Sequence, residues 1–224
     1  MNELKAYILN DDAPFAVKEG YKFLRTNIIF SLPDSGCKVI AFTSSHRSER
    51  KSSNTINTAI SFAEIGYKVL LIDCDLRLPT VATRLRIKSV PGFSNLLVGA
   101  NSIEQVITKL SENLDVIPAG RIPKEPTGLL TSQSMTDNLN LLRREYDYIF
   151  VDLPPVSTVA DAAIVSKNID GYLLVVRHQD SQYKEIKEAL RLLRLSGANV
   201  LGFVYNDAPI AGKKSYAKNN YYAK

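Results

Sequence analysis

The feature that most constrains the fold is a series of short apolar runs separated by stretches with helical periodicity. The runs lie at residues 38–42, 69–73, 114–117, 148–152, 171–176 and 200–205. Because the runs are continuous rather than alternating, they predict strands that are buried on both faces of a parallel sheet. Helices are predicted near residues 14–31, 51–65, 102–110, 133–146, 158–168 and 182–196. This alternation predicts a three-layer, doubly wound α/β fold with a mostly parallel sheet.

Residues 1–211 are expected to form a single domain, followed by a polar, basic and flexible tail at 212–224. The two cysteines, Cys37 and Cys74, show no pairing pattern, which suits a reducing cytoplasm. No apolar run approaches the length of a membrane span. The net charge of +5 is mild and accompanies no nucleic-acid motif, so we expect no nucleic-acid partner.

The segment at residues 43–53, directly after the first run, has the outline of a phosphate-binding loop. A strand, a loop, Lys51-Ser52 and a helix are the context of a Walker A motif. In such a loop, backbone N–H groups and the helix N-terminus converge on phosphate oxygens, the lysine neutralises the outer phosphates and the hydroxyl holds magnesium. The predicted nucleotide-binding residues of this loop are Ser48, Glu49, Arg50, Lys51, Ser52 and Ser53.

Ser48 and Arg50 occupy positions where a phosphate-binding loop normally has glycine. A non-glycine residue forced to positive φ costs about 1–2 kcal/mol, and a Cβ can keep the backbone away from a phosphate. The two substitutions are expected either to weaken nucleotide binding by about one to three orders of magnitude or to give the loop another shape. Arg47 and Arg50 add charge that could attract phosphate through a different geometry, and an ordinary strand-to-helix turn is the simpler alternative.

Acidic residues follow two of the predicted strands. Asp73 and Asp75 lie at the end of one strand, and Asp152 ends another. Ligands of doubly wound folds bind beyond the carboxyl ends of the strands, and Mg²⁺ needs only one or two carboxylates besides phosphate oxygens. Three aspartates on two strands, with Lys51 and Ser52 after a third, therefore predict a metal–phosphate site.

Two segments lie outside the alternating pattern. Glu19, Lys22 and Arg25 have helical spacing on the 14–31 helix and share one face, which alone would indicate a solvated surface. The tail carries three tyrosines without aliphatic neighbours, a pattern compatible with both mobility and phosphorylation. These are Tyr216, Tyr221 and Tyr222.

Together these motifs resemble the bacterial tyrosine kinases of capsule and exopolysaccharide biosynthesis, over nearly the whole chain. That family belongs to the P-loop NTPases with a deviant, MinD/ParA-like Walker A motif. The matching segments are Thr43-Ser44-Ser45, Leu-Leu-Ile-Asp-x-Asp-x-Arg-x-Pro at 71–79, Pro118-Ala119-Gly120, the Walker B strand at 146–155 with Asp161-Ala162 after it, and the tyrosine tail. The Glu19, Lys22 and Arg25 helix is similar to the family's Glu-x-x-Arg-x-x-Arg motif, with Lys22 replacing one arginine.

The resemblance implies an enzyme that uses ATP and Mg²⁺ to phosphorylate tyrosines of its own tail in trans, and that regulates polysaccharide synthesis and export. It assigns Lys51 to the β/γ-phosphates and Asn206 to the adenine base. It implies that Asp73 helps to deprotonate the incoming tyrosine. The implied catalytic residues are Lys51, Asp73, Asp75 and Asp152, and the implied metal site is formed by Ser52, Asp75 and Asp152.

The resemblance also implies a homo-oligomeric ring that assembles through Glu19, Lys22 and Arg25. Its implied partners are a separate transmembrane activator of the polysaccharide co-polymerase type and a cognate tyrosine phosphatase, with the chain cytoplasmic and recruited to the inner face of the plasma membrane. A partitioning-type ATPase would have a lysine where this chain has His46. A pseudokinase scaffold with weak or no ATP binding stays open as an alternative, and Ser48 and Arg50 favour it.

Overall fold

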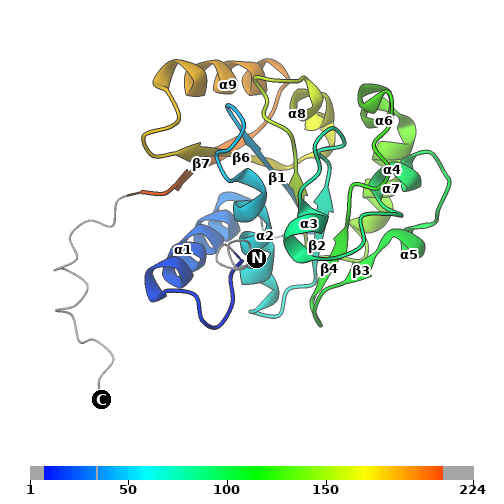
Figure 1. The fold of residues 1–224 in the computed structure, drawn as a ribbon, viewed down its shortest axis with the longest axis horizontal. Helices are drawn as coiled ribbons and strands as arrows, with labels where there is room; N and C mark the ends of the chain where they lie inside the picture. The colour runs from blue at the N-terminus through cyan, green and yellow to red at the C-terminus, as the bar shows by residue number, and fades with distance from the viewer. Residues whose placement is uncertain (1–7, 34, 209–224) are drawn as a thin grey trace.

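The computed structural model describes residues 8–33 and 35–208. Within these ranges one seven-stranded sheet has the order β3-β4-β2-β5-β1-β6-β7 (Figure 1). Its strands are β1 (Lys38–Ser44), β2 (Val69–Asp73), β3 (Thr108–Lys109), β4 (Leu114–Ile117), β5 (Tyr148–Asp152), β6 (Gly171–Arg177) and β7 (Val200–Asn206). Only the β3–β4 pair is antiparallel in this sheet. The predicted mostly parallel α/β fold is therefore confirmed.

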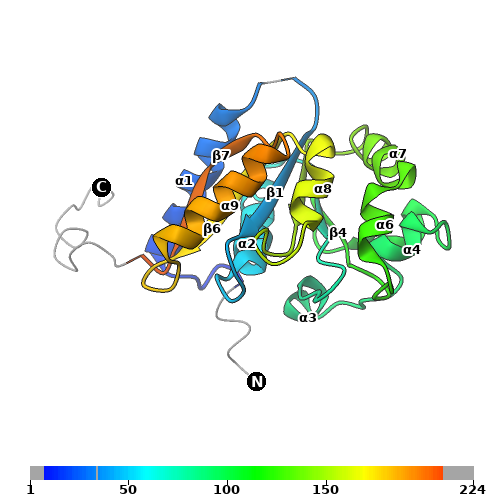
Figure 2. The same cartoon turned by 90° about the horizontal axis from the view of Figure 1, so that it is seen from above.

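Helices cover both faces of the sheet and complete three layers, as Figures 1 and 2 show from two directions. One face carries α1 (Phe15–Ser31), α2 (Lys51–Ala63) and α3 (Val81–Leu85). The other carries α4 (Phe93–Leu97), α5 (Ile103–Val106), α6 (Pro126–Thr131), α7 (Gln133–Leu142), α8 (Asp161–Ile164), the 3-10 turn η2 (Val165–Asn168) and α9 (Tyr183–Leu195).

The central strands are apolar throughout because their side chains enter two separate cores. In β1, Ile40 and Phe42 pack in the core beneath α1 and α2. Val39 and Ala41, which alternate with them, pack in the core on the opposite face. All four side chains are fully buried. The continuous apolar runs in the sequence thus follow from a sheet that is covered on both sides.

The sequence-based prediction of helices was wrong in three places. The helix expected at 102–110 ends at Val106, because Thr108 and Lys109 pair with β4 as the antiparallel edge strand β3. The helix expected at 158–168 is the short α8 followed by the 3-10 turn η2. The helices α3, α4 and α6 were missed, since runs of five or six residues are too short to show a helical period.

No helix in residues 8–33 and 35–208 is long and apolar enough to cross a membrane. The predicted phosphoacceptors Tyr216, Tyr221 and Tyr222 lie outside the described residues, as does the boundary expected between domain and tail.

Candidate active site

The carboxyl ends of the parallel strands meet at one edge of the sheet and frame a cavity of about 260 Å³. The register places Asp73 at the end of β2 directly opposite Asp152 at the end of β5. The cavity lies between three segments. It is lined by residues 44 and 47–52 after β1, by Asp75, Arg77, Leu78, Thr80 and Arg84 after β2, and by Pro154, Pro155, Thr158 and Val159 after β5. The predicted site therefore has the space that a ligand needs.

One buried carboxylate, that of Asp152, contacts both Lys51 and Ser52. Lys51 Nζ lies 2.5 Å from Asp152 Oδ1, and Ser52 Oγ donates to Asp152 Oδ2 at 2.5 Å. Thr55 Oγ1 also donates to Asp152, at 3.2 Å. Asp152 is fully buried, and Lys51 and Ser52 are each only 8% exposed. The lysine, the hydroxyl and the aspartate, predicted from two distant parts of the sequence, thus form one cluster.

The loop keeps the backbone shape of a glycine-containing turn without the glycines. Ser48 has φ +70° and Arg50 has φ +62°, both in the left-handed region. Arg50 is the N-cap of α2, and no side chain caps this helix end. The first N–H groups of α2 therefore stay available to an anion at the cavity, as at other helix N-termini that bind phosphate.

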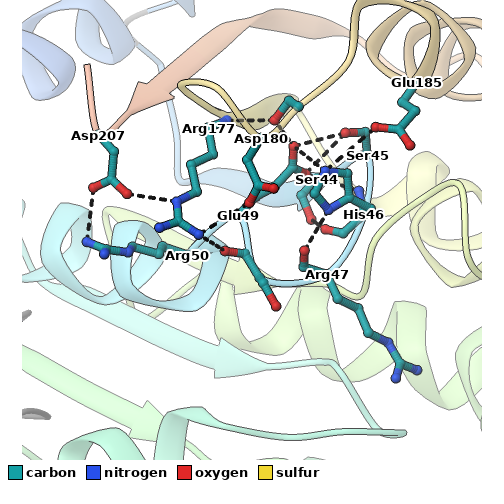
Figure 3. Close-up of polar contacts among 12 residues, drawn as sticks. Ser44, Ser45, His46, Arg47, Glu49, Arg50, Arg177, Asp180, Glu185 and Asp207 are labelled. Atoms are coloured by element: carbon teal, nitrogen blue, oxygen red, sulfur yellow. Dashed lines mark hydrogen bonds and ion pairs between the residues drawn. The ribbon is translucent and has the colours of Figure 1, made fainter. Parts of the chain in front are cut away.

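Ion pairs between side chains hold this loop against the ends of β6 and β7 (Figure 3). Asp207 accepts from Arg177 Nε at 2.8 Å and lies 3.0 Å from Arg50 Nη1. Arg177 Nη1 also donates to the carbonyl of Ser48, at 3.4 Å. Asp207 itself has φ +54°. Strained backbone at three residues is thus accompanied by contacts that join all three, a combination typical of functional sites.

The side chain of Glu49 is bonded within the loop. Its side chain is buried and accepts from Ser45 Oγ and from the backbone N–H of His46, each at 3.0 Å. Ser181, in the segment before α9, also donates to Glu49. Ser53 Oγ accepts from Arg84 Nη1 at 3.0 Å. The nucleotide contacts predicted for Glu49 and Ser53 stay predictions.

The two aspartates after β2 have different surroundings. Asp73 is fully buried and accepts N–H bonds from the backbone of Asp75, Thr80 and Val81 at 3.0–3.2 Å. Burial and the charge of Asp152 raise the pKa of Asp73 to about 7. Asp75 lines the cavity, and burial raises its pKa as well. Asp73 therefore holds the loop that follows β2, while Asp75 presents its carboxylate to the cavity.

The structure places Asn206 at the end of β7, beyond the residues that line the cavity. Its Nδ2 is buried and has no hydrogen-bond partner among the described residues. An unpaired buried amide is uncommon in native proteins and needs an explanation, of which a functional role is one. This is what the predicted contact with a base would require, and that contact stays a prediction.

The three predicted interface residues do not point the same way. Glu19 and Lys22 form an ion pair of 2.7 Å on the outer surface of α1. Arg25 instead turns toward α2, where its Nη1 donates to Ser61 Oγ at 2.9 Å. The assembly predicted for this helix stays a prediction. Within the single chain, Arg25 joins α1 to α2.

Sequence reasoning missed several charged residues around the cavity. Arg77 pairs with Asp161 at 2.8 Å. The only signal for it in the sequence was its place as the arginine of the motif at 71–79. Arg177 is the last residue of β6 and Asp207 directly follows β7, so their positions at strand ends could have identified them. Arg84 belongs to a helix of five residues that the periodicity did not reveal.

Replacing Ser48 by glycine is expected to stabilise the protein by about 0.5–1 kcal/mol. The substitution removes about 1–2 kcal/mol of left-handed strain and is opposed by the greater chain entropy of glycine in the unfolded state. Urea unfolding of Ser48→Gly and Ser48→Ala measures the effect, since alanine keeps the Cβ and hence the strain. Equal stability of the two variants would contradict the interpretation.

Comparisons with known proteins agree with this geometry. Residues 37–193 match the family described as AAA domain. The tyrosine-protein kinase YwqD of Bacillus subtilis is 35% identical over 88% of this chain and 84% of its own length. The kinase domain of the Escherichia coli tyrosine kinase ETK superimposes with a TM-score of 0.81, at 27% identity over 93% of this chain and 87% of that domain.

A more distant similarity concerns the fold alone. The septum site-determining protein MinD of Pyrococcus horikoshii, solved in complex with Mg-ADP, is 23% identical and has a TM-score of 0.64 over 75% of this chain and 70% of that one. This confirms the predicted MinD-like fold. With the cluster of Lys51, Ser52 and Asp152 in place, the chain belongs to the family of bacterial tyrosine kinases.

Proposed function

We propose that this chain transfers the terminal phosphoryl group of ATP to tyrosine, and that it regulates the synthesis and export of a capsular or extracellular polysaccharide. The observation that carries the proposal is that Lys51 and Ser52, which line the cavity, both bond to the buried carboxylate of Asp152. This is the arrangement with which P-loop proteins hold nucleotide phosphates and magnesium. The names of the curated relatives support the same activity.

The charges around the cavity fit a polyphosphate. Its basic lining residues outnumber the two acidic ones, Glu49 and Asp75, and Glu49 is already bonded within the loop. The basic residues are Arg47, Arg50, Lys51, Arg77 and Arg84. Ser52, Asp75 and Asp152 are oxygen donors of the kind that Mg²⁺ prefers, and they would hold the ion beside the phosphates. Bound Mg²⁺ would supply neutralisation of the phosphate charge.

The proposed reaction is a direct displacement at the terminal phosphorus. The phenolic oxygen of tyrosine forms a bond to phosphorus while the bond to the β-phosphate oxygen breaks, and ADP leaves with that electron pair. The phenolic proton needs an acceptor on the protein. The sequence predicted Asp73 for this step, whereas the buried contacts of Asp73 favour Asp75, which lines the cavity. Lys51 and the N-terminus of α2 orient the phosphates.

The acceptor in this proposal is the tail of a neighbouring copy, with Tyr216, Tyr221 and Tyr222 as the phosphorylated residues. The ring, the transmembrane activator, the tyrosine phosphatase and recruitment to the membrane belong to the same proposal. Phosphorylated tails would loosen the ring at the Glu19–Arg25 interface through repulsion between neighbouring copies, because each phosphate adds up to two negative charges. Release of the ring after phosphorylation would follow, and a ring of unchanged size after phosphorylation would count against it.

A scaffold that binds ATP weakly is the second candidate, and one specific observation favours it. Ser48 and Arg50 are both left-handed and carry a Cβ on the backbone that phosphates approach. The scaffold would retain the fold and regulate the same pathway without transferring phosphate.

Calorimetric titration with Mg-ATP separates the two candidates. We expect a dissociation constant in the micromolar range for the unmodified protein, and a change of less than about tenfold in Arg50→Gly, because that variant relieves strain but loses the contact with Asp207. Absence of binding up to millimolar ATP, together with binding by Arg50→Gly, would establish the scaffold.

Mixing two variants with Mg-ATP tests whether phosphate is transferred between copies or within one copy. One variant ends at residue 211 and keeps Lys51, and the other is full-length Lys51→Met. Phosphotyrosine on the full-length variant, located by mass spectrometry, is expected for transfer between copies. Phosphotyrosine on the unmodified full-length protein only would indicate transfer within one copy.

A further inference from the structure

The wall of the cavity formed by α3 holds an arginine that has so far been given no specific role beyond its charge. Arg84 lies in the last turn of α3 and lines the cavity together with Thr80. Its Nη1 donates to the hydroxyl of Ser53, two residues after Lys51, at 3.0 Å. This hydrogen bond fixes the guanidinium group beside the first turn of α2, where phosphates bind in P-loop proteins.

Two polar atoms of this wall lack partners. Arg84 Nε and Thr80 Oγ1 are both buried, and neither has a hydrogen-bond partner among the described residues. A buried donor without an acceptor costs about 1–3 kcal/mol, and more when it is charged. Native structures rarely keep such groups without a reason, and a ligand is one of the explanations.

The charge of Arg84 is also unbalanced, in contrast to that of three other cations that line the cavity. Lys51 pairs with Asp152, Arg77 with Asp161 and Arg50 with Asp207. Arg84, although half-buried, forms no ion pair with a carboxylate in the part of the chain that the structure describes. A half-buried cation that faces a cavity and lacks an internal counterion is suited to an anionic ligand.

The order of the strands indicates which part of a nucleotide lies near this wall. The phosphate-binding loop follows β1, Asn206 ends β7 two strands to one side, and α3 follows β2 two strands to the other side. If Asn206 contacts the base, the phosphate chain runs from β7 toward β2. Arg84 then lies at the far end of the nucleotide, where the terminal phosphoryl group is transferred.

We propose that the guanidinium group of Arg84 binds the terminal phosphoryl group of ATP, with the hydroxyl of Thr80 beside it. The inference rests on the proposed function, because it takes ATP as the ligand of the cavity. Arg84 spreads positive charge over the phosphoryl oxygens while the bond to the β-phosphate breaks, which stabilises the transition state more than the bound ATP. It makes little contact with ADP, which lacks that group.

The test compares Mg-ATP with Mg-ADP as probes, by calorimetry on the full chain. Arg84→Met is expected to weaken Mg-ATP binding about 10- to 100-fold, the effect of one charge-assisted hydrogen bond, and to leave the affinity for Mg-ADP within about twofold. Arg84→Lys keeps the charge without the planar fork and should recover part of the loss. Lys88→Met is the matched control, since it removes one exposed cation four residues away.

The outcomes separate failure of this inference from failure of the proposed function. Equal losses for Mg-ATP and Mg-ADP in Arg84→Met would show a structural role through Ser53, and unchanged affinity for both would show that Arg84 binds neither. Either result would overturn the inference while leaving the nucleotide site intact. If the unmodified protein binds neither nucleotide, the proposed function itself fails, and this inference fails with it.

Discussion

Replacing Lys51 by methionine is expected to weaken Mg-ATP binding on the order of 100-fold and to stop phosphoryl transfer. The reason for the first effect is the loss of a charge-assisted hydrogen bond to the phosphates, worth about 1.5–3 kcal/mol. Transfer stops because, among the described residues, Lys51 is the cation paired with Asp152. Methionine keeps nearly the length and volume of the side chain, so the cavity should keep its shape. Isothermal calorimetry and phosphotyrosine detection measure the two effects.

The same substitution is expected to reduce the free energy of unfolding by about 3–5 kcal/mol at pH 8, because it leaves buried carboxylates without their cation. The loss should be smaller at pH 5.5. Burial and the charge of Asp152 raise the pKa of Asp73 to about 7, although the positive charge of Lys51 acts in the opposite direction. Below that pH the Asp73 carboxyl is neutral with or without Lys51, so the substitution removes less electrostatic attraction. Above that pH Asp73 is ionised, and the substitution removes its attraction to the Lys51 cation.

Urea unfolding at the two pH values tests whether the loss of stability is larger at pH 8 than at pH 5.5. Lys124→Met, which removes an exposed lysine, serves as the control and should change stability by less than about 0.5 kcal/mol at either pH. A larger loss for Lys51→Met at pH 5.5 than at pH 8 would contradict the interpretation of the Asp73–Asp152 pair.

Replacing Phe62 by alanine is expected to cost about 3–5 kcal/mol of stability, as is usual for a large aromatic side chain in a core. Phe62 is fully buried in α2, and its ring centroid lies 4.4 Å from that of Tyr148 and 5.0 Å from that of Phe150. These contacts seat α2 on β5. Because α2 begins with Lys51 and β5 ends with Asp152, the substitution should also weaken nucleotide binding.

Chemical denaturation monitored by circular dichroism measures the first effect, and calorimetry measures the second. Tyr183→Ala is the control, because it removes an aromatic side chain that is 80% exposed at the start of α9. A loss below about 1 kcal/mol in Phe62→Ala would show that the cluster repacks around the cavity.

The strands could be predicted because every central strand is buried on both faces, which leaves an unbroken apolar run in the sequence. β5 is an example: Ile149 and Val151 enter one core, and Tyr148 and Phe150 enter the other. Short elements were beyond such reasoning. β3 has two residues and exists through its pairing with β4, a tertiary contact that no local pattern encodes.

At the site, the sequence predicted the groups that stand at strand ends or in a motif, and the structure brings Lys51, Ser52 and Asp152 together as expected. It did not predict how Ser48 and Arg50 would be tolerated. That depends on Arg177 and Asp207, which are more than a hundred residues away in the chain and come near only through the order of the strands. Residue propensities predict the backbone strain at Ser48 and Arg50. The contacts that offset this strain are made with residues distant in the chain, so no local pattern predicts them.

The ion pairs that support the loop have a consequence for how the protein responds to its solution. In a glycine loop the backbone shape is intrinsic and indifferent to salt. Here the shape depends on Arg50, Arg177 and Asp207, whose side chains are 30–32% exposed. Pairs at that depth are partly screened at physiological ionic strength. Nucleotide affinity in this protein is therefore coupled to ionic strength through the loop itself, in addition to the direct screening of the phosphates.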